Sequence, residues 1–279
     1  MASEDAAGGA RRLGRMTPEQ LRALLEEVAA QAARTGELPD EAQAGPPAGP
    51  LFRPTDTRVA GVVADWVTPV AQRWAPQIDL EPLDLARVLA QGLTRQKPVA
   101  AVEVAPSGLI ALTLEDSARS AIVPLVIEDQ DHYALAAGER RHDLVEAPGS
   151  RPVDDPVRSA QLAHARLCRI IRNAEAAGVD RRPSTRLGEL THVAERHLLV
   201  ALADLPQRLA THVGDEVQQR RAVTDLAALA DAWDHPVRPT VVGVHPQPVH
   251  GARLLLADAV RIVLRNGLAR LGAAAPERM

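Results

Sequence analysis

Apolar residues near the start of the chain recur at intervals of three and four positions. From Leu21 to Ala32 they fall on one face of a helix, opposite charged and polar residues. Thr17 and Gln20 have the spacing of a capping box at the start of this helix, and Gly36 is placed to end it. The pattern therefore predicts an amphipathic helix near the N-terminus of a folded domain.

Two more helices and a hairpin are predicted in the same domain. Residues 59–75 and 81–93 have helical patterns, and Pro69 must bend the first helix or mark its true start. Residues 99–114 are apolar or alternating on both sides of a Pro-Ser-Gly turn, which predicts a β-hairpin. Helices followed by paired strands predict a small α+β domain over residues 16–126.

The pattern changes on both sides of this domain. Residues 1–15 are small or charged, which predicts a disordered tail. Residues 127–152 combine acidic, basic and turn-forming positions with little apolar content, so we predict a linker there. Residues 153–279 have helical spacing throughout, interrupted at glycines and prolines, which predicts an all-α bundle of about five helices. The expected fold is an α+β N-terminal domain followed by an all-α helical bundle.

Charge is distributed unevenly along the chain. Residues 1–150 carry 14 basic and 22 acidic side chains, a net charge of −8, and residues 151–279 carry 18 basic and 14 acidic side chains, a net charge of +4. This asymmetry supports two structural units and places any polyanion partner on the second. The excess permits RNA binding without requiring it.

Composition excludes several classes of protein. No apolar run approaches the roughly 18 residues that span a bilayer, and the N-terminal residues lack the pattern of a secretory signal. The single cysteine, Cys168, excludes an intrachain disulfide and fits a reducing compartment. We therefore expect a cytoplasmic protein with no membrane partner.

Motifs for independent chemistry are absent from the sequence. His192 and His197 are five positions apart and no cysteine pair accompanies them, which is not the spacing of a zinc site. Cys168 falls among the core positions of its helix, and no serine lies in a Gly-x-Ser-x-Gly elbow. We expect no metal, no cofactor and no catalytic residue.

Three C-terminal segments carry a family resemblance. DPVRSAQLAHARLCRIIRNA (residues 155–174), RLLLADAVRIVLRNGLARLG (residues 253–272) and the final LGAAAPERM (residues 271–279) occur in this order. They resemble the first long helix, the last helix and the terminal Pro-Glu-Arg-Met of the anticodon-binding, DALR-type domain of arginyl-tRNA synthetases. The resemblance implies that residues 153–279 adopt this helical fold.

The first domain resembles the N-terminal additional domain of the same family. ADWVTPVA (residues 64–71) is similar to the family's Gly-Asp-aromatic-Ala/Ser-Thr/Ser-Asn-Val-Ala pattern and keeps Asp65, Trp66 and Thr68. The family's glycine and asparagine are replaced by Ala64 and Pro69. The segments PLDLARVLAQGL and VEVAPSGLIALTL resemble the helix and the paired strands that follow in the family.

The family's catalytic signatures are not found between these two parts. No His-x-Gly-His occurs, and a Lys-Met-Ser-Lys-Ser loop cannot exist in a sequence whose only lysine is Lys97. Adenylate formation requires several groups that stabilise charge on the reacting phosphate. The resemblance therefore implies a synthetase-like chain from which the catalytic domain is missing.

The resemblance also suggests RNA contacts, because in the family the N-terminal domain contacts the tRNA elbow and the helical domain grips the anticodon stem-loop. Four arginines fall within about 120° of a helical wheel, opposite an apolar face, and could follow phosphates; a solvated helix face is the alternative. The terminal pair could approach the anticodon or simply pack for stability. Tryptophans could stack on bases or fill the core. The candidate RNA-binding residues are Arg158, Arg166, Arg169, Arg172, Trp233, Arg278, Met279, Trp66 and Thr68.

Three hypotheses remain open at this point. The first is a non-catalytic arginyl-tRNA synthetase-like protein that binds tRNA or a tRNA-like RNA through its helical domain. The second is an interaction or regulatory protein that has lost RNA binding and docks on a full-length synthetase or another protein. The third is the non-catalytic part of a split arginine–tRNA ligase.

Overall fold

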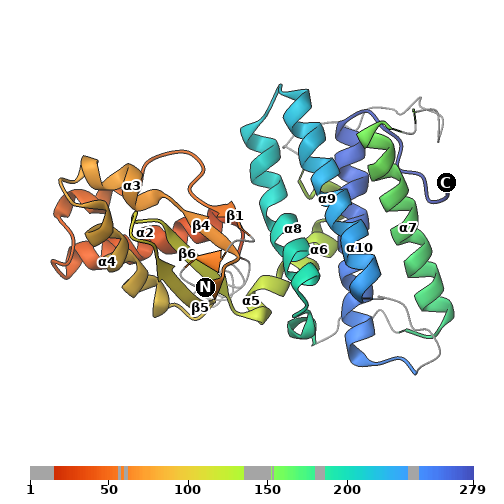
Figure 1. The fold of residues 1–279 in the computed structure, drawn as a ribbon, viewed down its shortest axis with the longest axis horizontal. Coiled ribbons are helices and arrows are strands. Elements are labelled where there is room, and N and C mark those ends of the chain that lie inside the picture. The colour runs from red at the N-terminus through yellow and green to blue at the C-terminus, as the bar shows by residue number, and fades with distance from the viewer. Residues whose placement is uncertain are drawn as a thin grey trace, which may run out of the picture. The chain divides into compact units, whose positions relative to one another are not determined.

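The chain divides into two compact units, Met1–Arg119 and Ser120–Met279 (Figure 1). The computed structural model describes residues 16–55, 58–59, 62–134, 152, 154–179, 186–237 and 245–279. The predicted tail over residues 1–15, and residues 135–151 of the predicted linker, lie outside the described residues.

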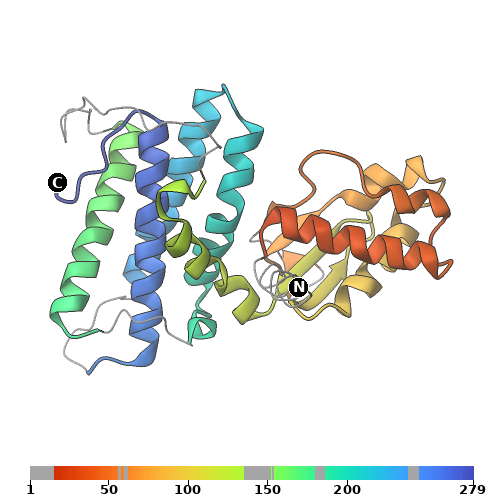
Figure 2. The same cartoon turned by 180° about the vertical axis from the view of Figure 1, so that it is seen from behind.

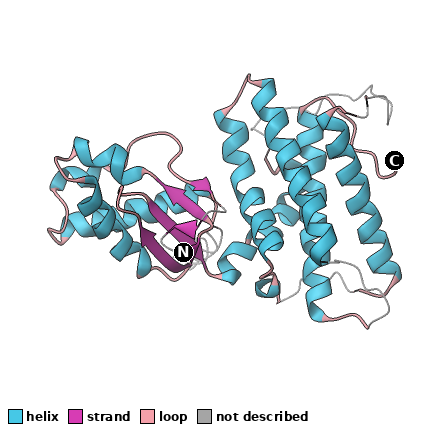
Figure 3. Ribbon diagram, in the orientation of Figure 1, coloured by secondary structure: helices cyan, strands magenta, loops and turns pink. Residues whose placement is uncertain are grey.

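The first unit contains helices on a small antiparallel sheet (Figure 3). Its helical segments are α2 (Pro18–Arg34), η1 (Asp40–Ala44), α3 (Val70–Trp74), η2 (Ala75–Gln77), α4 (Pro82–Thr94) and α5 (Asp116–Ser120). The predicted capping box is present at α2, where the Thr17 backbone N–H donates to Gln20 Oε1 at 3.1 Å. Apolar side chains of α2 from Leu21 to Ala33 are buried, as their spacing predicts.

The sheet has four strands in the order β1-β4-β6-β5, with every neighbouring pair antiparallel. Its strands are β1 (Arg53–Pro54), β4 (Trp66–Thr68), β5 (Val99–Val104) and β6 (Ile110–Leu114). A separate two-stranded ladder joins β2 (Arg58–Val59) and β3 (Val62–Val63). The predicted hairpin corresponds to β5 and β6, and Gly108 takes a φ of +81° in the turn between them.

The prediction of one helix over residues 59–75 is wrong. The segment forms three short strands before the helix α3, which begins only at Val70. Pro69 is the N-cap residue of α3, and the residue before a proline is driven towards extended conformations. The Thr68 hydroxyl then accepts a hydrogen bond from the Val70 N–H at 3.1 Å, which ties the end of β4 to the start of α3.

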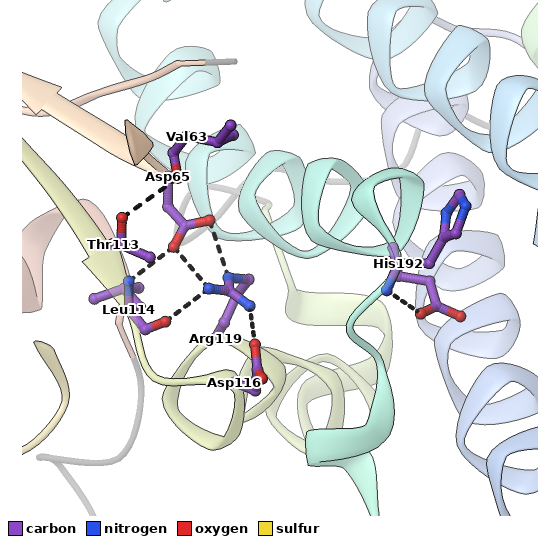
Figure 4. A network of polar contacts seen from close by, with 8 residues as sticks. Val63, Asp65, Thr113, Leu114, Asp116, Arg119 and His192 are labelled. Carbon is purple, nitrogen blue, oxygen red and sulfur yellow. Dashed lines mark hydrogen bonds and ion pairs between the residues drawn. The ribbon is translucent and has the colours of Figure 1, made fainter. Parts of the chain in front are cut away.

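A buried ion pair closes the first unit where its last strand ends (Figure 4). Arg119 Nε donates to Asp65 Oδ1 at 3.0 Å, and Arg119 Nη2 donates to Asp65 Oδ2 at 2.9 Å. Arg119 also donates to the Leu114 carbonyl at 2.7 Å and to the exposed Asp116 carboxylate at 2.6 Å. Asp65 Oδ2 in turn accepts from the Leu114 N–H at 2.8 Å. The side chains of Asp65 and Arg119 are each only 2 % exposed, so their ion pair joins β4, β6 and α5 away from water.

The described residues of the second unit form helices, turns and loops (Figure 3). The helical segments are α6 (Ile122–Asp129), η3 (Gln130–His132), α7 (Pro156–Ala176), η4 (Leu187–Glu189), α8 (Val193–Thr211), α9 (Glu216–Val237) and α10 (Pro248–Arg270). The helix α10 packs against α6, α7, α8 and α9, and Figure 2 shows it between α7 and α6 from behind. Its residues are buried almost all the way round.

The boundary between the units differs from the predicted one. Residues 122–129, which we divided between the first domain and the linker, form α6 and pack on α10 and α8. The following turn is held by Asn266 Nδ2, which donates to the carbonyls of Gln130 at 2.8 Å and Tyr133 at 3.0 Å. Tyr133 donates its hydroxyl to the Leu202 carbonyl at 2.7 Å, and Arg265 pairs with Asp131. Apolar burial on α10 thus assigns this segment to the second unit.

We expect Arg119→Met to destabilise the first unit by about 3–5 kcal/mol, because it leaves the Asp65 carboxylate buried without its cation. Arg87→Met is the matched control, since Arg87 pairs with Asp84 at 3.2 Å while both side chains are more than 60 % exposed. Its cost should stay below about 1 kcal/mol. Urea unfolding followed by circular dichroism measures both. Equal losses in the two variants would contradict a dominant role for the buried pair.

A second prediction concerns Asp204 of α8, which is 4 % exposed. Burial raises the pKa of Asp204 from 3.8 to about 6, and the nearby Arg208 partly opposes this rise. The folded state therefore binds this proton more tightly than the unfolded state, so stability from this group falls as the pH rises from about 4 to 6. Asp204→Asn should raise stability at pH 8 by about 3 kcal/mol, since the pKa rises by about two units and one unit corresponds to about 1.4 kcal/mol.

Thermal unfolding between pH 4.5 and 8 tests this prediction. The advantage of Asp204→Asn over the native protein should grow with pH and level off above the pKa of Asp204. Asp154→Asn, which changes an exposed carboxylate of the same unit, is the control and should follow the native pH profile. A constant difference between Asp204→Asn and the native protein at every pH would refute the linkage.

Candidate functional site

The helix α7 presents one polar face and buries the rest of its surface. Its N-cap residue Asp155 accepts a hydrogen bond from the Val157 N–H at 2.8 Å, and Pro156 occupies the first turn. The buried side contains Val157, Ala160, Leu167, Ile170 and Ile171, which the sequence places opposite the arginines.

The four candidate arginines of α7 lie on this polar face and differ in exposure and in their ion-pair partners. Arg158 is half-buried. Arg166 donates from Nη1 to Asp231 Oδ1 of α9 at 2.6 Å, and the two side chains are 35 % and 40 % exposed. Arg172 approaches Glu277, with 3.4 Å to its carbonyl and 4.0 Å to its carboxylate. Arg169 is exposed and forms no ion pair or side-chain hydrogen bond with the part of the chain that the structure describes.

The C-terminal tail lies along α7, beside Gln161, His164 and Arg172. Gly272, with a φ of +66°, ends α10, and the Ala273 N–H donates back to the Leu268 carbonyl at 2.8 Å. Gln161 Nε2 then donates to the Ala274 carbonyl at 3.0 Å, and His164 Nδ1 lies 2.9 Å from the Pro276 carbonyl. Figures 1 and 2 both show the C-terminus beside α7.

Two of the candidate tail residues are accessible. Arg278 and Met279 follow the bound part of the tail, and Met279 is 47 % exposed. Arg172 lies beside their neighbour Glu277, so the tail ends close to the C-terminal part of α7. Arg169 and Arg172 of α7 and Arg278 and Met279 at the end of the tail are the accessible candidates of this region, and we call these four residues the α7–tail face.

Three other candidates require correction, because the structure buries them. Trp233 of α9 and Trp66 of β4 are fully enclosed, and their indole N–H groups have no hydrogen-bond partner in the described ranges of the chain. Thr68 is also enclosed, and its hydroxyl caps α3 as described above. None of these side chains presents a surface to an RNA, and all three fill cores.

Titratable groups beneath the tail are adapted to burial. Burial lowers the pKa of His164, which keeps its imidazole neutral. Burial also raises the pKa of Cys168, whose Sγ lies 3.9 Å from His164 Nδ1, so this thiol is a poor nucleophile. Within the described residues no three His, Cys, Asp or Glu side chains gather as a metal site requires, and no helix combines the length and apolar character needed to cross a membrane.

The polar contacts between α7 and the tail were not predicted from the sequence. Gln161 and His164 are each only 1 % exposed, yet both are polar and three positions apart on the buried side of an amphipathic helix. Buried polar side chains almost always have hydrogen-bond partners. Their occurrence at core positions was therefore a signal that another segment must supply acceptors.

Comparison with known proteins shows which family the sequence of this region matches. A model described as the DALR anticodon binding domain matches residues 160–279. Proteins named arginine–tRNA ligase are similar over more of the chain: that of Clavibacter sepedonicus is 37% identical over 60% of this chain and 30% of its own length. That of Frankia alni is 32% identical over 69% and 35%, and that of Kineococcus radiotolerans is 32% identical over 73% and 36%.

The matches cover only part of the length of these ligases. The chain spans about a third of the length of these ligases. The Kineococcus match covers more of the chain than residues 160–279 comprise, so similarity extends beyond the matched domain. The helices α7 to α10 thus form a DALR anticodon binding domain, and the chain is a homologue of the arginine–tRNA ligases.

Proposed function

We propose that this protein binds tRNA or a tRNA-like RNA through the α7–tail face and does not itself form an aminoacyl adenylate. The observation that carries the proposal is the gathering of accessible cationic residues on a domain of the anticodon-binding family. Arg169 is exposed without an ion-pair partner among the described residues, Arg172 follows it on the same side of α7, and Arg278 comes directly after Glu277, whose carbonyl Arg172 approaches. Guanidinium groups can pair bidentately with phosphate.

Base stacking contributes little to this binding mode. The chain contains five aromatic residues, and all of them are at most 4 % exposed: Phe52, Trp66, Trp74, Tyr133 and Trp233. A stacked base is worth about 1–3 kcal/mol in proteins that recognise single strands. Without an accessible ring, RNA affinity must depend mainly on phosphate contacts, which predicts weak sequence selectivity and a steep dependence on salt.

The proposed absence of catalysis rests on the sequence. Stabilising the charge on a reacting phosphate takes several preorganised cationic or dipolar groups. The two signature motifs of the synthetases do not occur, and Lys97 is the only lysine in the 279 residues. Lys97 lies exposed after α4.

A protein-interaction function is the second candidate. Two valines at the turn between α8 and α9, Val213 and Val217, are 69 % and 70 % exposed. Exposed apolar side chains close together favour a protein contact. In this alternative the chain docks on a full-length synthetase or another protein and the α7–tail face is only a solvated surface.

Filter binding with unfractionated tRNA at several salt concentrations tests the RNA proposal. Arg169→Gln should reduce the slope of log K against log salt by about one, because one phosphate contact is lost. Arg172→Gln should act similarly. Arg166→Gln should have a smaller effect, since this guanidinium is already paired with Asp231. Arg95→Gln is the control, because Arg95 is an exposed arginine of the first unit.

The outcomes separate the two candidate functions. Retention of tRNA at low salt, weakened by Arg169→Gln but not by Arg95→Gln, supports the α7–tail face. Equal weakening by both variants would show nonspecific attraction instead. No retention at the lowest salt would refute RNA binding and favour the protein-interaction function.

Arginine-dependent exchange of pyrophosphate into ATP tests the second part of the proposal. The purified chain should give no exchange above a heat-inactivated sample, because it lacks the groups that stabilise the adenylate transition state. An active arginine–tRNA ligase assayed in parallel is the positive control. Exchange by the isolated chain would overturn the non-catalytic assignment while leaving the RNA-binding test unaffected.

A further inference from the structure

The hydrogen bonds between α7 and the C-terminal tail are made to carbonyl groups of the tail. Gln161 donates to the Ala274 carbonyl at 3.0 Å, His164 to the Pro276 carbonyl at 2.9 Å, and Arg172 approaches the Glu277 carbonyl at 3.4 Å. These three side chains follow one another along α7, so the tail runs beside the helix in the same direction. The Glu277 carboxylate also lies 4.0 Å from Arg172, whereas Arg278 and Met279 make none of these contacts and are exposed.

The protonation state of His164 is fixed by its surroundings. A carbonyl oxygen only accepts, so Nδ1 must carry the hydrogen in this contact. Burial lowers the pKa of His164 and keeps the ring neutral, which leaves Nε2 as a bare acceptor. His164 Nε2 and Gln161 Oε1 are both buried without a hydrogen-bond partner among the described residues. The hydrogen bonds to the tail therefore offset most of the desolvation cost of burying these two polar side chains.

We propose that Gln161 and His164 are positioning residues that anchor the tail so that Arg278 and Met279 complete the RNA-binding face of α7. This inference rests on the proposed RNA binding and deepens it. The two side chains are 1 % exposed and cannot touch an RNA themselves. They act through the tail, whose last two residues lie exposed beyond the anchored carbonyls.

Because the tail is anchored, it becomes ordered before RNA binds and not during binding. A free tail of this length would lose conformational freedom each time RNA bound, which weakens association. Ala273 is fully buried and the Pro276 carbonyl is already held, so the tail is ordered before RNA arrives. Arg278, two residues after the held Pro276 carbonyl, then adds its charge without a further ordering step, which is the usual benefit of preorganisation.

The anchoring is tested by removing the two donors while keeping the volume of both side chains. The variant is Gln161→Met combined with His164→Leu. His164→Asn is the matched conservative variant, because an asparagine amide can place a donor near the position of Nδ1. A nitroxide attached to Met279→Cys reports tail motion, and Cys168 is buried and should remain unlabelled, which labelling of the native protein checks.

We expect the double variant to sharpen the electron paramagnetic resonance line of the nitroxide, which indicates a mobile tail, and His164→Asn to leave it close to that of the reference protein. In unlabelled protein, the double variant should bind unfractionated tRNA several-fold more weakly, and His164→Asn should bind nearly as the native protein does. Circular dichroism establishes that each variant keeps its helical content. Together these results would establish a positioning role, because a purely structural role would not change tail motion and tRNA affinity while the helical content stays the same.

Each remaining outcome overturns a defined part of the proposal. An immobile tail in the double variant would show that the two side chains do not anchor it. A mobile tail with unchanged tRNA affinity would show that anchoring has no role in RNA binding, while the arginine variants would still support the α7–tail face. Absence of tRNA binding by the native protein would overturn the proposed function and this role together, whereas the nitroxide line would still report the anchoring itself.

Discussion

The enclosure of α10 is the constraint on which the second unit depends. This helix is buried on nearly all sides, so it is stable only when α6, α7, α8 and α9 cover it together. Close approach is built into the sequence: a Cβ at Gly267 would lie 2.8 Å from Val223 Cγ2, closer than real contacts allow. Polar exceptions are matched, as where Arg253 of α10 pairs at 2.8 Å with the fully buried Glu195 of α8. The fold is thus one core rather than a row of helix pairs.

The candidate site follows from this core. Covering α10 fixes which side of α7 is buried, and the remaining side carries the arginines. The tail continues directly from α10, so the end of the central helix also decides where the tail can lie. Gly272 turns the chain, and Gln161 and His164 provide donors on the neighbouring helix. The accessible face of α7 and the tail are therefore two consequences of one packing arrangement.

Local signals in the sequence predicted much of this, and non-local ones did not. The capping box at Thr17, the β5–β6 hairpin and the two sides of α7 depend on residues near one another in the chain. The burial of Trp66 and Trp233 depends on which elements pack together, as does the attachment of α6 to α10. All five aromatic residues of the chain are buried in this way, so none is left for the surface. Pro69 was recognised as a break, but the strands before it were not.

Carboxylates of the same chain partly neutralise the arginines of α7. Arg166 and Arg172 lie beside Asp231 and Glu277, so in the proposed binding mode an RNA phosphate competes with carboxylates that are already present. These pairs are partly exposed, and exposed pairs contribute only about 0–1 kcal/mol to stability, so exchanging a carboxylate for a phosphate costs the fold little. Arg169 has no such competitor among the described residues. The effective number of phosphate contacts is therefore smaller than the number of arginines, and it depends on whether the RNA approaches near Arg169 and the tail or near Asp231.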